Sequence, residues 1–413
     1  MWRYLLIALT ASLAACAEPV CCAPEPEPER PEMLMHEIMI TVEVPEASGS
    51  VYLAGNAPEL GPWAADALLM QGEGRERRAV ISLPDGFAFE YKVTLGSWDR
   101  EGLADPAGVP RNFQLVADAA QSVRHTIDHW KRPTSTYLDD WQGSGVLGEL
   151  VYWRDVVSAH LEPDRHVEIW LPPGYRDSDA RYPVIYMHDG QNLFDPRIAN
   201  TGVDWGVDEA IMRGVDAGRI RPAIIVGIWT GALRAAELSP WDRGDNYARF
   251  VVEELMPRVD AEFRTLTGPE HTFVMGSSMG GLASFHLIRN YPDVFGACGC
   301  ISTHFPFNWE NHAWTMGVDL PDGVDPERAL ILDDIEAGMR VPQGVRMWFD
   351  YGTETLDAIY EPSHMAVRDW LLAQGFEEGE DFIMRRYDGA AHNEASWRAR
   401  LDDPLSFLLA VEE

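Results

Sequence analysis

Cysteine is scarce in this sequence, and positive charge is much rarer than negative charge. The 413 residues contain five cysteines, which are too few and too clustered for a disulfide framework, and no Cys and His spacing resembles a zinc site. There are 33 Lys and Arg against 66 Asp and Glu, so the net charge is −33 at pH 7. Such a surface repels phosphate backbones. We therefore expect neither a metal site nor nucleic acid as a partner.

The first apolar run, Tyr4 to Leu13, is too short to cross a bilayer, which takes about twenty apolar residues. It follows a short positive start at Met1 to Arg3 and leads into Leu13-Ala14-Ala15-Cys16, as in an export signal. This tetrapeptide resembles a bacterial lipobox. The resemblance implies a signal peptide over 1–15 and a lipid anchor on Cys16. An ordinary secretory signal cleaved nearby is the alternative, and both predict export.

Residues 16–34 are rich in Pro and Glu and contain few apolar side chains to bury. This composition favours extended backbone, so the segment is predicted to be a tether that holds the folded part off a membrane. Ala17, rather than Asp, follows Cys16. By resemblance to lipoprotein sorting signals, this favours the outer membrane in a host that has one.

Short alternating runs bounded by Gly, Pro, Asn or Asp fill residues 35–130. Their length and spacing predict a small all-β, immunoglobulin-like sandwich. A linker is expected over 131–147. The predicted strands are Ile38 to Val44, Ser50 to Ala54, Ala79 to Leu83, Phe87 to Leu95 and Ser122 to Ile127.

Two motifs in this region carry a resemblance. Val51 to Asn56 with Leu60 to Trp63, and Phe89 to Thr94 with Gly96 to Asp99, are similar to the family 20 starch-binding carbohydrate module. The resemblance implies a sugar platform made by Trp63, Lys92 and a second tryptophan. Trp98 is the candidate for that second position, although it lies earlier than in the family. The alternative is that Trp63 and Trp98 anchor the core or a loop.

Beyond residue 148, apolar runs alternate with segments of helix length. This alternation predicts a mostly parallel sheet covered by helices over 148–413. Residues 246 to 262 have the apolar spacing of one helix. The predicted strands are Val167 to Leu171, Val184 to Met187, Ala223 to Ile228, Thr272 to Met275, Gly296 to Ser302, Val345 to Tyr351 and Phe382 to Tyr387.

Gly276-Ser277-Ser278-Met279-Gly280 is a Gly-x-Ser-x-Gly motif between a strand pattern and a helix pattern. That context is typical of a nucleophile elbow, in which glycines allow a tight turn that exposes the serine. Ser278 is the candidate nucleophile. A serine nucleophile needs a base, and in this fold the order along the chain is nucleophile, acid, histidine. His392 lies late in the chain, in a loop after a strand pattern, and is the candidate base.

The acid should follow the strand that ends near Tyr351. Asp357 and Glu354 both do so, whereas Asp350 is still within the strand, and spacing alone does not decide between the first two. Two N–H groups should bind the charge that develops on the substrate oxygen. We expect these from Met279, directly after the nucleophile, and from Gln191. Gly190 is expected to adopt the unusual backbone that the second of these turns needs.

These motifs together carry a second resemblance, covering nearly all of 148–413. Leu171 to Tyr175, Tyr182 to Phe194, Gly276 to Gly281 and Gly389 to His392 are similar to the "Putative esterase" family, which includes enterochelin esterase-like, feruloyl, acetylxylan and esterase D-type enzymes. The resemblance implies an α/β hydrolase fold, a Ser/acid/His triad, no cofactor, and Gln191 as an oxyanion donor. Many members carry Asp where this chain has Thr355, so the acid remains open.

The sequence thus predicts an exported, lipid-anchored serine ester hydrolase. The appended module favours an acylated carbohydrate as substrate. A siderophore ester of the enterochelin type is one alternative, and a non-catalytic carbohydrate-binding lipoprotein of the cell surface is another.

Overall fold

The computed structural model describes residues 34–45, 48–60, 63–104, 111–131, 145–162, 164–231, 233–321 and 323–411. The predicted signal peptide, Cys16 and nearly all of the predicted tether lie outside these ranges, as does most of the predicted linker. No helix in the described ranges is long and apolar enough to cross a membrane.

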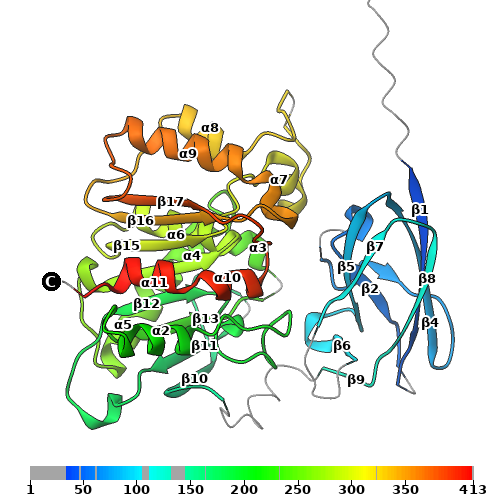
Figure 1. The fold of residues 1–413 in the computed structure, drawn as a ribbon, viewed down its shortest axis with the longest axis horizontal. Helices are drawn as coiled ribbons and strands as arrows, with labels where there is room; N and C mark the ends of the chain where they lie inside the picture. Colours follow the sequence, from blue (N-terminus) through cyan, green and yellow to red (C-terminus); the bar gives the residue numbers. More distant parts are fainter. Residues whose placement is uncertain are drawn as a thin grey trace, which may run out of the picture.

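The N-terminal region is rich in β-structure (Figure 1). One sheet has the order β4-β1-β8 and another the order β3-β2-β5-β7, and side chains from both form one apolar core that includes Ile40, Leu53 and Phe89. Along β4, buried and exposed side chains alternate, as the sequence pattern predicts. The strands are β1 (Met35–Glu43), β2 (Tyr52–Gly55), β3 (Leu68–Leu69), β4 (Glu76–Pro84), β5 (Phe87–Thr94), β7 (Phe113–Ala117) and β8 (Gln121–Thr126), with a further pair, β6 (Gly102–Leu103) and β9 (His129–Trp130).

The C-terminal region contains an eight-stranded sheet in the order β10-β11-β13-β12-β14-β15-β16-β17. The pairs β10–β11 and β11–β13 are antiparallel, and every pair from β13 to β17 is parallel. The predicted mostly parallel sheet is therefore confirmed. The strands are β10 (Glu149–Val156), β11 (Arg165–Leu171), β12 (Val184–His188), β13 (Ile224–Ile228), β14 (Thr272–Ser277), β15 (Ala297–Ile301), β16 (Arg346–Tyr351) and β17 (Phe382–Arg386).

Helices cover both faces of this sheet (Figure 1). Strand β12 is buried on both faces: Val184 and Tyr186 belong to one core cluster, and Ile185 and Met187 to the other. Helices α4, α5, α6, α8 and α9 contribute to the first cluster, and α2, α10 and α11 to the second. The helices are α2 (Val207–Asp216), α3 (Arg234–Glu237), α4 (Gly244–Arg249), α5 (Met256–Glu262), α6 (Met279–Asn290), α7 (Trp309–Met316), α8 (Leu330–Glu336), α9 (Glu361–Ala373), α10 (Glu394–Arg400) and α11 (Asp402–Leu409).

The single helix predicted over 246 to 262 is interrupted in its middle. A π-helical turn, η5 (Phe250–Leu255), lies between α4 and α5, and the chain stays helical throughout. A π-turn adds a residue to the repeat without breaking the apolar face, so the periodicity of the sequence does not reveal it.

Two fully buried histidines stand beside the carboxyl ends of the strands. His188 ends β12 and shares a hydrogen bond of 2.7 Å between its Nδ1 and the Tyr247 hydroxyl. His364, in α9, donates from Nδ1 to the Tyr360 carbonyl oxygen at 3.0 Å. Burial lowers the pKa of each imidazole to about 4, because the charged form would lose its hydration.

We expect acid to destabilise the fold through His188 and His364. Both are neutral in the folded chain, whereas in the unfolded chain they take up protons below about pH 6.5. The unfolded state therefore binds more protons between about pH 6.5 and about pH 4. As the pH is lowered through this window, the free energy of unfolding should decrease, by up to about 1.4 kcal/mol per pH unit for each histidine. The melting temperature, followed by circular dichroism, measures this.

The replacement His364→Gln should make the dependence of melting temperature on pH less steep, because it removes one of the buried neutral histidines. The control His129→Gln alters an exposed histidine of β9 and should leave the slope unchanged. A wild-type melting temperature that stays constant across the window would contradict the prediction.

Candidate active site

Ser278 sits on a strained turn between β14 and α6. Its φ of 56° and ψ of −120° are unusual for a residue with a side chain. The flanking glycines allow this turn, because a Cβ on Gly276 would lie 2.8 Å from the carbonyl carbon of Gly280. The Ser278 N–H donates to the Ile301 carbonyl at 2.9 Å. The turn thus holds the serine side chain at the carboxyl end of the central strands.

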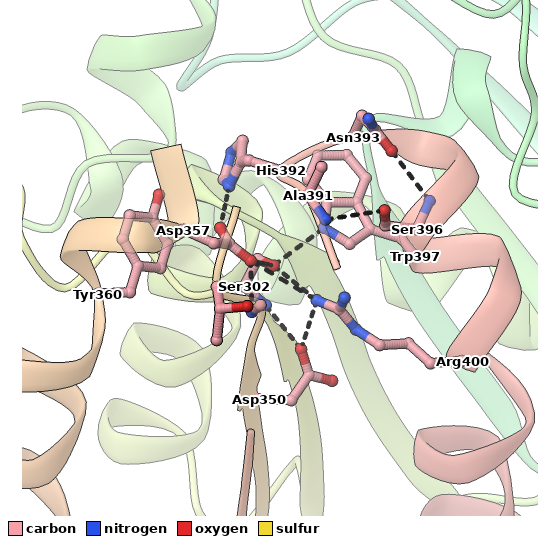
Figure 2. A network of polar contacts seen from close by, with 12 residues as sticks. Ser302, Asp350, Asp357, Tyr360, Ala391, His392, Asn393, Ser396, Trp397 and Arg400 are labelled. Atoms are coloured by element: carbon pink, nitrogen blue, oxygen red, sulfur yellow. Dashed lines mark hydrogen bonds and ion pairs between the residues drawn. The ribbon is translucent and has the colours of Figure 1, made fainter. Parts of the chain in front are cut away.

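His392 and Asp357 form a hydrogen-bonded line with this serine. His392 Nε2 lies 3.0 Å from Ser278 Oγ, and His392 Nδ1 lies 2.6 Å from Asp357 Oδ1. His392 comes from the loop between β17 and α10, and Asp357 from the short helix η7 (Thr355–Ile359) after β16 (Figure 2). An ionised carboxylate can only accept, so Nδ1 carries the hydrogen and the Nε2 lone pair faces the serine hydroxyl.

The two other acids of this segment lie elsewhere. The Glu354 side chain is exposed at the start of η7, and the Glu354 N–H donates to the Ala390 carbonyl at 3.0 Å. Asp350 is buried within β16 and pairs with Arg400 at 2.9 Å. Of the three, Asp357 is the acid that bonds His392. Burial alone would raise the Asp357 pKa, but the hydrogen bonds from His392, Ser302 and Gly352 outweigh it and hold this pKa below its ordinary value.

The turn after β12 packs against the start of α6. It forms the short helix η4 (Gly190–Asn192), and a Cβ on Gly280 would lie 3.2 Å from His188 Cβ and 3.7 Å from an Asp189 carboxylate oxygen. The Gln191 and Met279 N–H groups are therefore brought to neighbouring turns. Neither N–H has a hydrogen-bond acceptor among the residues that the structure describes. They are available to an oxygen atom of a bound molecule.

The prediction that Gly190 adopts the unusual backbone of this turn is wrong. The left-handed residue is Asp189, with a φ of 56°. Gly190 is needed for a different reason: a Cβ there would lie 2.5 Å from the carbonyl carbon of Gly227 on β13. Asp189 is held by Arg234, which donates to its two oxygens at 2.6 and 2.7 Å, and by the Thr230 hydroxyl at 2.5 Å. Sequence reasoning missed these two partners, since neither lies in a recognisable motif.

Sequence reasoning also missed a group of aromatic side chains and a histidine around His392. The Tyr360 ring lies 5.5 Å from the His392 ring, and the Trp397 ring lies 5.1 Å away on an edge. The Tyr360 hydroxyl shares a hydrogen bond of 2.5 Å with His304 Nδ1. Burial lowers the pKa of His304 to about 3, so this second histidine near the site is neutral. No cluster of His, Cys, Asp or Glu in the described ranges could hold a metal ion.

The candidate sugar-binding residues of the N-terminal region separate into two groups. Trp63 and Trp98 are half-buried, and their ring centroids lie 6.3 Å apart with the planes inclined by 51°. Lys92 is instead 6% exposed and pairs with Glu101 at 3.3 Å. The structure therefore brings the two indoles together and leaves little of the Lys92 ammonium group accessible.

Comparisons with known proteins agree with this arrangement. The family model described as "Putative esterase" matches residues 158–408, and the one described as "Starch binding domain" matches residues 36–103. An iron(III) enterobactin esterase of Dickeya dadantii is 23% identical over 257 residues, which are 60% of this chain and 53% of that protein. An endo-1,4-beta-xylanase/feruloyl esterase of Xylanibacter ruminicola is 26% identical over 181 residues, which are 39% of this chain and 22% of that protein.

A solved structure is similar in fold over most of the chain. The enterobactin esterase of Shigella flexneri superposes with a TM-score of 0.50 at 18% sequence identity, over 91% of this chain and 93% of that structure. The chain spans 53% and 22% of the lengths of the two curated relatives named above. The "Putative esterase" model, by contrast, matches more than half of the 413 residues. The chain belongs to the "Putative esterase" family.

Proposed function

We propose that this protein hydrolyses carboxylic esters through Ser278, His392 and Asp357. The observation that carries the proposal is the hydrogen-bonded line from Ser278 Oγ through His392 to Asp357, with distances of 3.0 and 2.6 Å, on a strained elbow. Each group has the neighbour that its role requires. The nucleophile faces a lone pair, and the base is held in one tautomer by a buried carboxylate.

In the proposed reaction, Ser278 Oγ attacks the ester carbonyl while His392 Nε2 takes the hydroxyl proton. The new C–O bond places negative charge on the carbonyl oxygen, and the Gln191 and Met279 N–H groups donate to it. The tetrahedral intermediate collapses, and His392 returns the proton to the departing alcohol. Water, deprotonated by His392, then cleaves the acyl-enzyme, which releases the acid and restores Ser278.

Substrate preference is proposed from the N-terminal region. We infer that it is an immunoglobulin-like sandwich that binds carbohydrate through Trp63 and Trp98, because two neighbouring indoles offer flat apolar faces to a pyranose ring. The burial of Lys92 leaves it out of this platform. The substrate class is then an acylated carbohydrate. A siderophore ester is the second candidate, which the names of the enterobactin esterases among its relatives favour.

The place of action is also a proposal. The lipobox-like Leu13-Ala14-Ala15-Cys16 supports export and a lipid anchor on Cys16, and Ala17 supports the outer membrane in a host that has one. A non-catalytic surface lipoprotein is disfavoured, because Ser278, His392 and Asp357 are all present and hydrogen-bonded to one another in sequence.

Replacement of the proposed nucleophile and acid should abolish most of the activity. Ser278→Ala should lower kcat about 10⁴-fold, and Asp357→Asn about 10²- to 10⁴-fold, because the amide favours the wrong tautomer of His392. Activity is measured on p-nitrophenyl acetate, methyl ferulate, acetylated xylan and ferric enterobactin. The matched control Glu354→Gln, three positions from Asp357, should keep kcat within about twofold. Full activity of Ser278→Ala, or a large loss in Glu354→Gln, would refute the assignment.

Replacement of one platform indole should weaken carbohydrate binding. Trp63→Ala should lower the affinity for insoluble starch or acetylated xylan about tenfold or more, because truncation of a tryptophan at the centre of a binding surface typically costs about 2 kcal/mol or more. Pull-down on the insoluble polysaccharide measures this. Trp241→Ala, which alters a half-buried tryptophan of the C-terminal region, is the control and should bind as the wild type does. Equal binding by Trp63→Ala would remove Trp63 from the platform.

A further inference from the structure

Ser302 lies behind the acid, at the end of β15, and connects three elements that are far apart in the sequence (Figure 2). Its hydroxyl oxygen lies 2.6 Å from Asp357 Oδ2, 3.0 Å from Trp397 Nε1 and 2.6 Å from Arg400 Nη2. Trp397 and Arg400 both belong to α10. The side chain is fully buried, so water does not compete for these contacts.

The chemistry of these partners fixes the direction of the Ser302 O–H bond. An indole N–H and a guanidinium can only donate, and a serine hydroxyl has one hydrogen and two lone pairs. Trp397 and Arg400 therefore occupy both lone pairs. The single hydrogen is left for Asp357 Oδ2, which accepts a second bond from the Gly352 N–H at 2.6 Å.

Arg400 is itself anchored on its far side. Its Nη2 has two hydrogens, one directed to Ser302 and the other to Asp350 Oδ1 at 2.9 Å. The same Asp350 oxygen accepts the Ser302 N–H at 3.0 Å, and Asp350 Oδ2 accepts from Trp348 at 2.8 Å. Ser302 is thus held through both its backbone and its hydroxyl group.

The backbone conformation of Ser302 would suit glycine better than serine, which indicates that the serine hydroxyl group is needed at this position. Its φ is 38°, in the left-handed region where glycine is favoured and other residues are strained. A glycine would fit this conformation without strain but would bring no donor to Asp357. The strain is tolerated because the hydrogen bonds to Asp350, Asp357 and Arg400 hold the residue in place.

We propose that Ser302 is a positioning residue that orients the Asp357 carboxylate and, through it, the imidazole of His392. This inference rests on the proposed function. With its Oδ2 held by Ser302 and Gly352, the Asp357 carboxylate cannot rotate about its Cβ–Cγ bond, and Oδ1 is kept on His392 Nδ1.

Other charged and titratable groups face the same pair and stay in place when Ser302 is changed. Arg400 lies 3.9 Å from Asp357 Oδ2, and Asp350 is bonded to Arg400. Around His392 stand His304, Tyr360 and Glu394. These groups are the same in the wild type and in the variants. A difference in kcat or pH profile between the wild type and a Ser302 variant is therefore due to the loss of the Ser302 hydroxyl group.

The test is the variant Ser302→Gly in the full chain, which removes the hydroxyl and relieves the backbone strain. We expect a kcat about 10- to 100-fold lower with KM within about twofold, because a misplaced carboxylate impairs the reaction more than substrate binding. The acid side of the kcat/KM profile should move to lower pH, because a carboxylate that is no longer held on Nδ1 stabilises the imidazolium less. The melting temperature should fall only modestly, because relief of the backbone strain offsets part of the cost of the lost buried hydrogen bonds.

The control Thr303→Val deletes the neighbouring buried hydroxyl, which donates to the Cys300 carbonyl at 2.9 Å and does not bond Asp357. It should leave the pH profile unchanged. Wild-type kcat and pH profile in Ser302→Gly, or an equal shift of the pH profile in Thr303→Val, would overturn the proposal. If Ser302→Gly does not fold, Ser302→Ala replaces it, because it also removes the hydroxyl group that donates to Asp357. The same shift then supports the proposal, and an unchanged profile overturns it.

Failure of the proposed function gives a different result. If Ser278→Ala keeps full activity, the hydrolytic role of this site is refuted, whatever Ser302 does. The protonation of His392 is then followed by ¹⁵N NMR of its ring in the Ser278→Ala background, with and without Ser302→Gly. A shift of the titration to lower pH on loss of the hydroxyl supports the positioning role without any turnover, and identical titrations overturn it.

Discussion

The hydrogen bond of 2.6 Å between His392 Nδ1 and Asp357 Oδ1 is the contact on which the rest of the site depends. It decides which ring nitrogen of His392 carries the hydrogen, and hence that a lone pair faces Ser278. The contact needs an ionised carboxylate in a buried place, where burial alone would favour the neutral acid. Three hydrogen-bond donors around Asp357 offset that cost, from His392, Ser302 and Gly352.

The parallel sheet explains how these groups meet. Ser278, Ser302 and Asp357 follow β14, β15 and β16, which are neighbours in the sheet, and His392 follows β17 at its edge. The carboxyl ends of parallel strands lie at one edge, so residues far apart in the sequence gather there. Strand β12 adds Gln191 from the other side of β14. The register of five strands thus positions the proposed nucleophile, base, acid and oxyanion donors.

The parts of this arrangement that depend on local patterns could be predicted from the sequence. The apolar runs of β12 to β16 predicted a buried parallel sheet, and the glycines around Ser278 predicted a tight turn. The choice between Asp357 and Glu354 could not be made, because it depends on which way side chains point from η7. Thr355 has a φ of 53° there, and this turn leaves Glu354 exposed and Asp357 buried. No spacing rule contains that information.

Contacts between elements that are far apart in the sequence could not be predicted either, for the same reason. Ser302 and Arg400 are 98 positions apart, and each looks like an ordinary polar residue in its own segment. Lys92 carries a motif that resembles a sugar-binding strand, yet Glu101 pairs with it inside the protein. Strand β10 was missed because its side chains are mostly half-buried and show no clean alternation. In each case packing, rather than local preference, decides the outcome.

The charge balance behind Asp357 links this packing to the proposed reaction. Asp350 and Asp357 bring two negative charges into a buried region, and Arg400 brings one positive charge. The resting cluster therefore holds one unbalanced negative charge, which is costly in a medium of low polarity. When His392 takes the proton of Ser278, its imidazolium neutralises that charge. A fixed, buried negative charge that is matched only in the transition state lowers the barrier without solvent having to reorganise. By this argument Arg400 and Asp350 matter as a pair, because loss of Arg400 alone would add a second unbalanced charge that the imidazolium could not match.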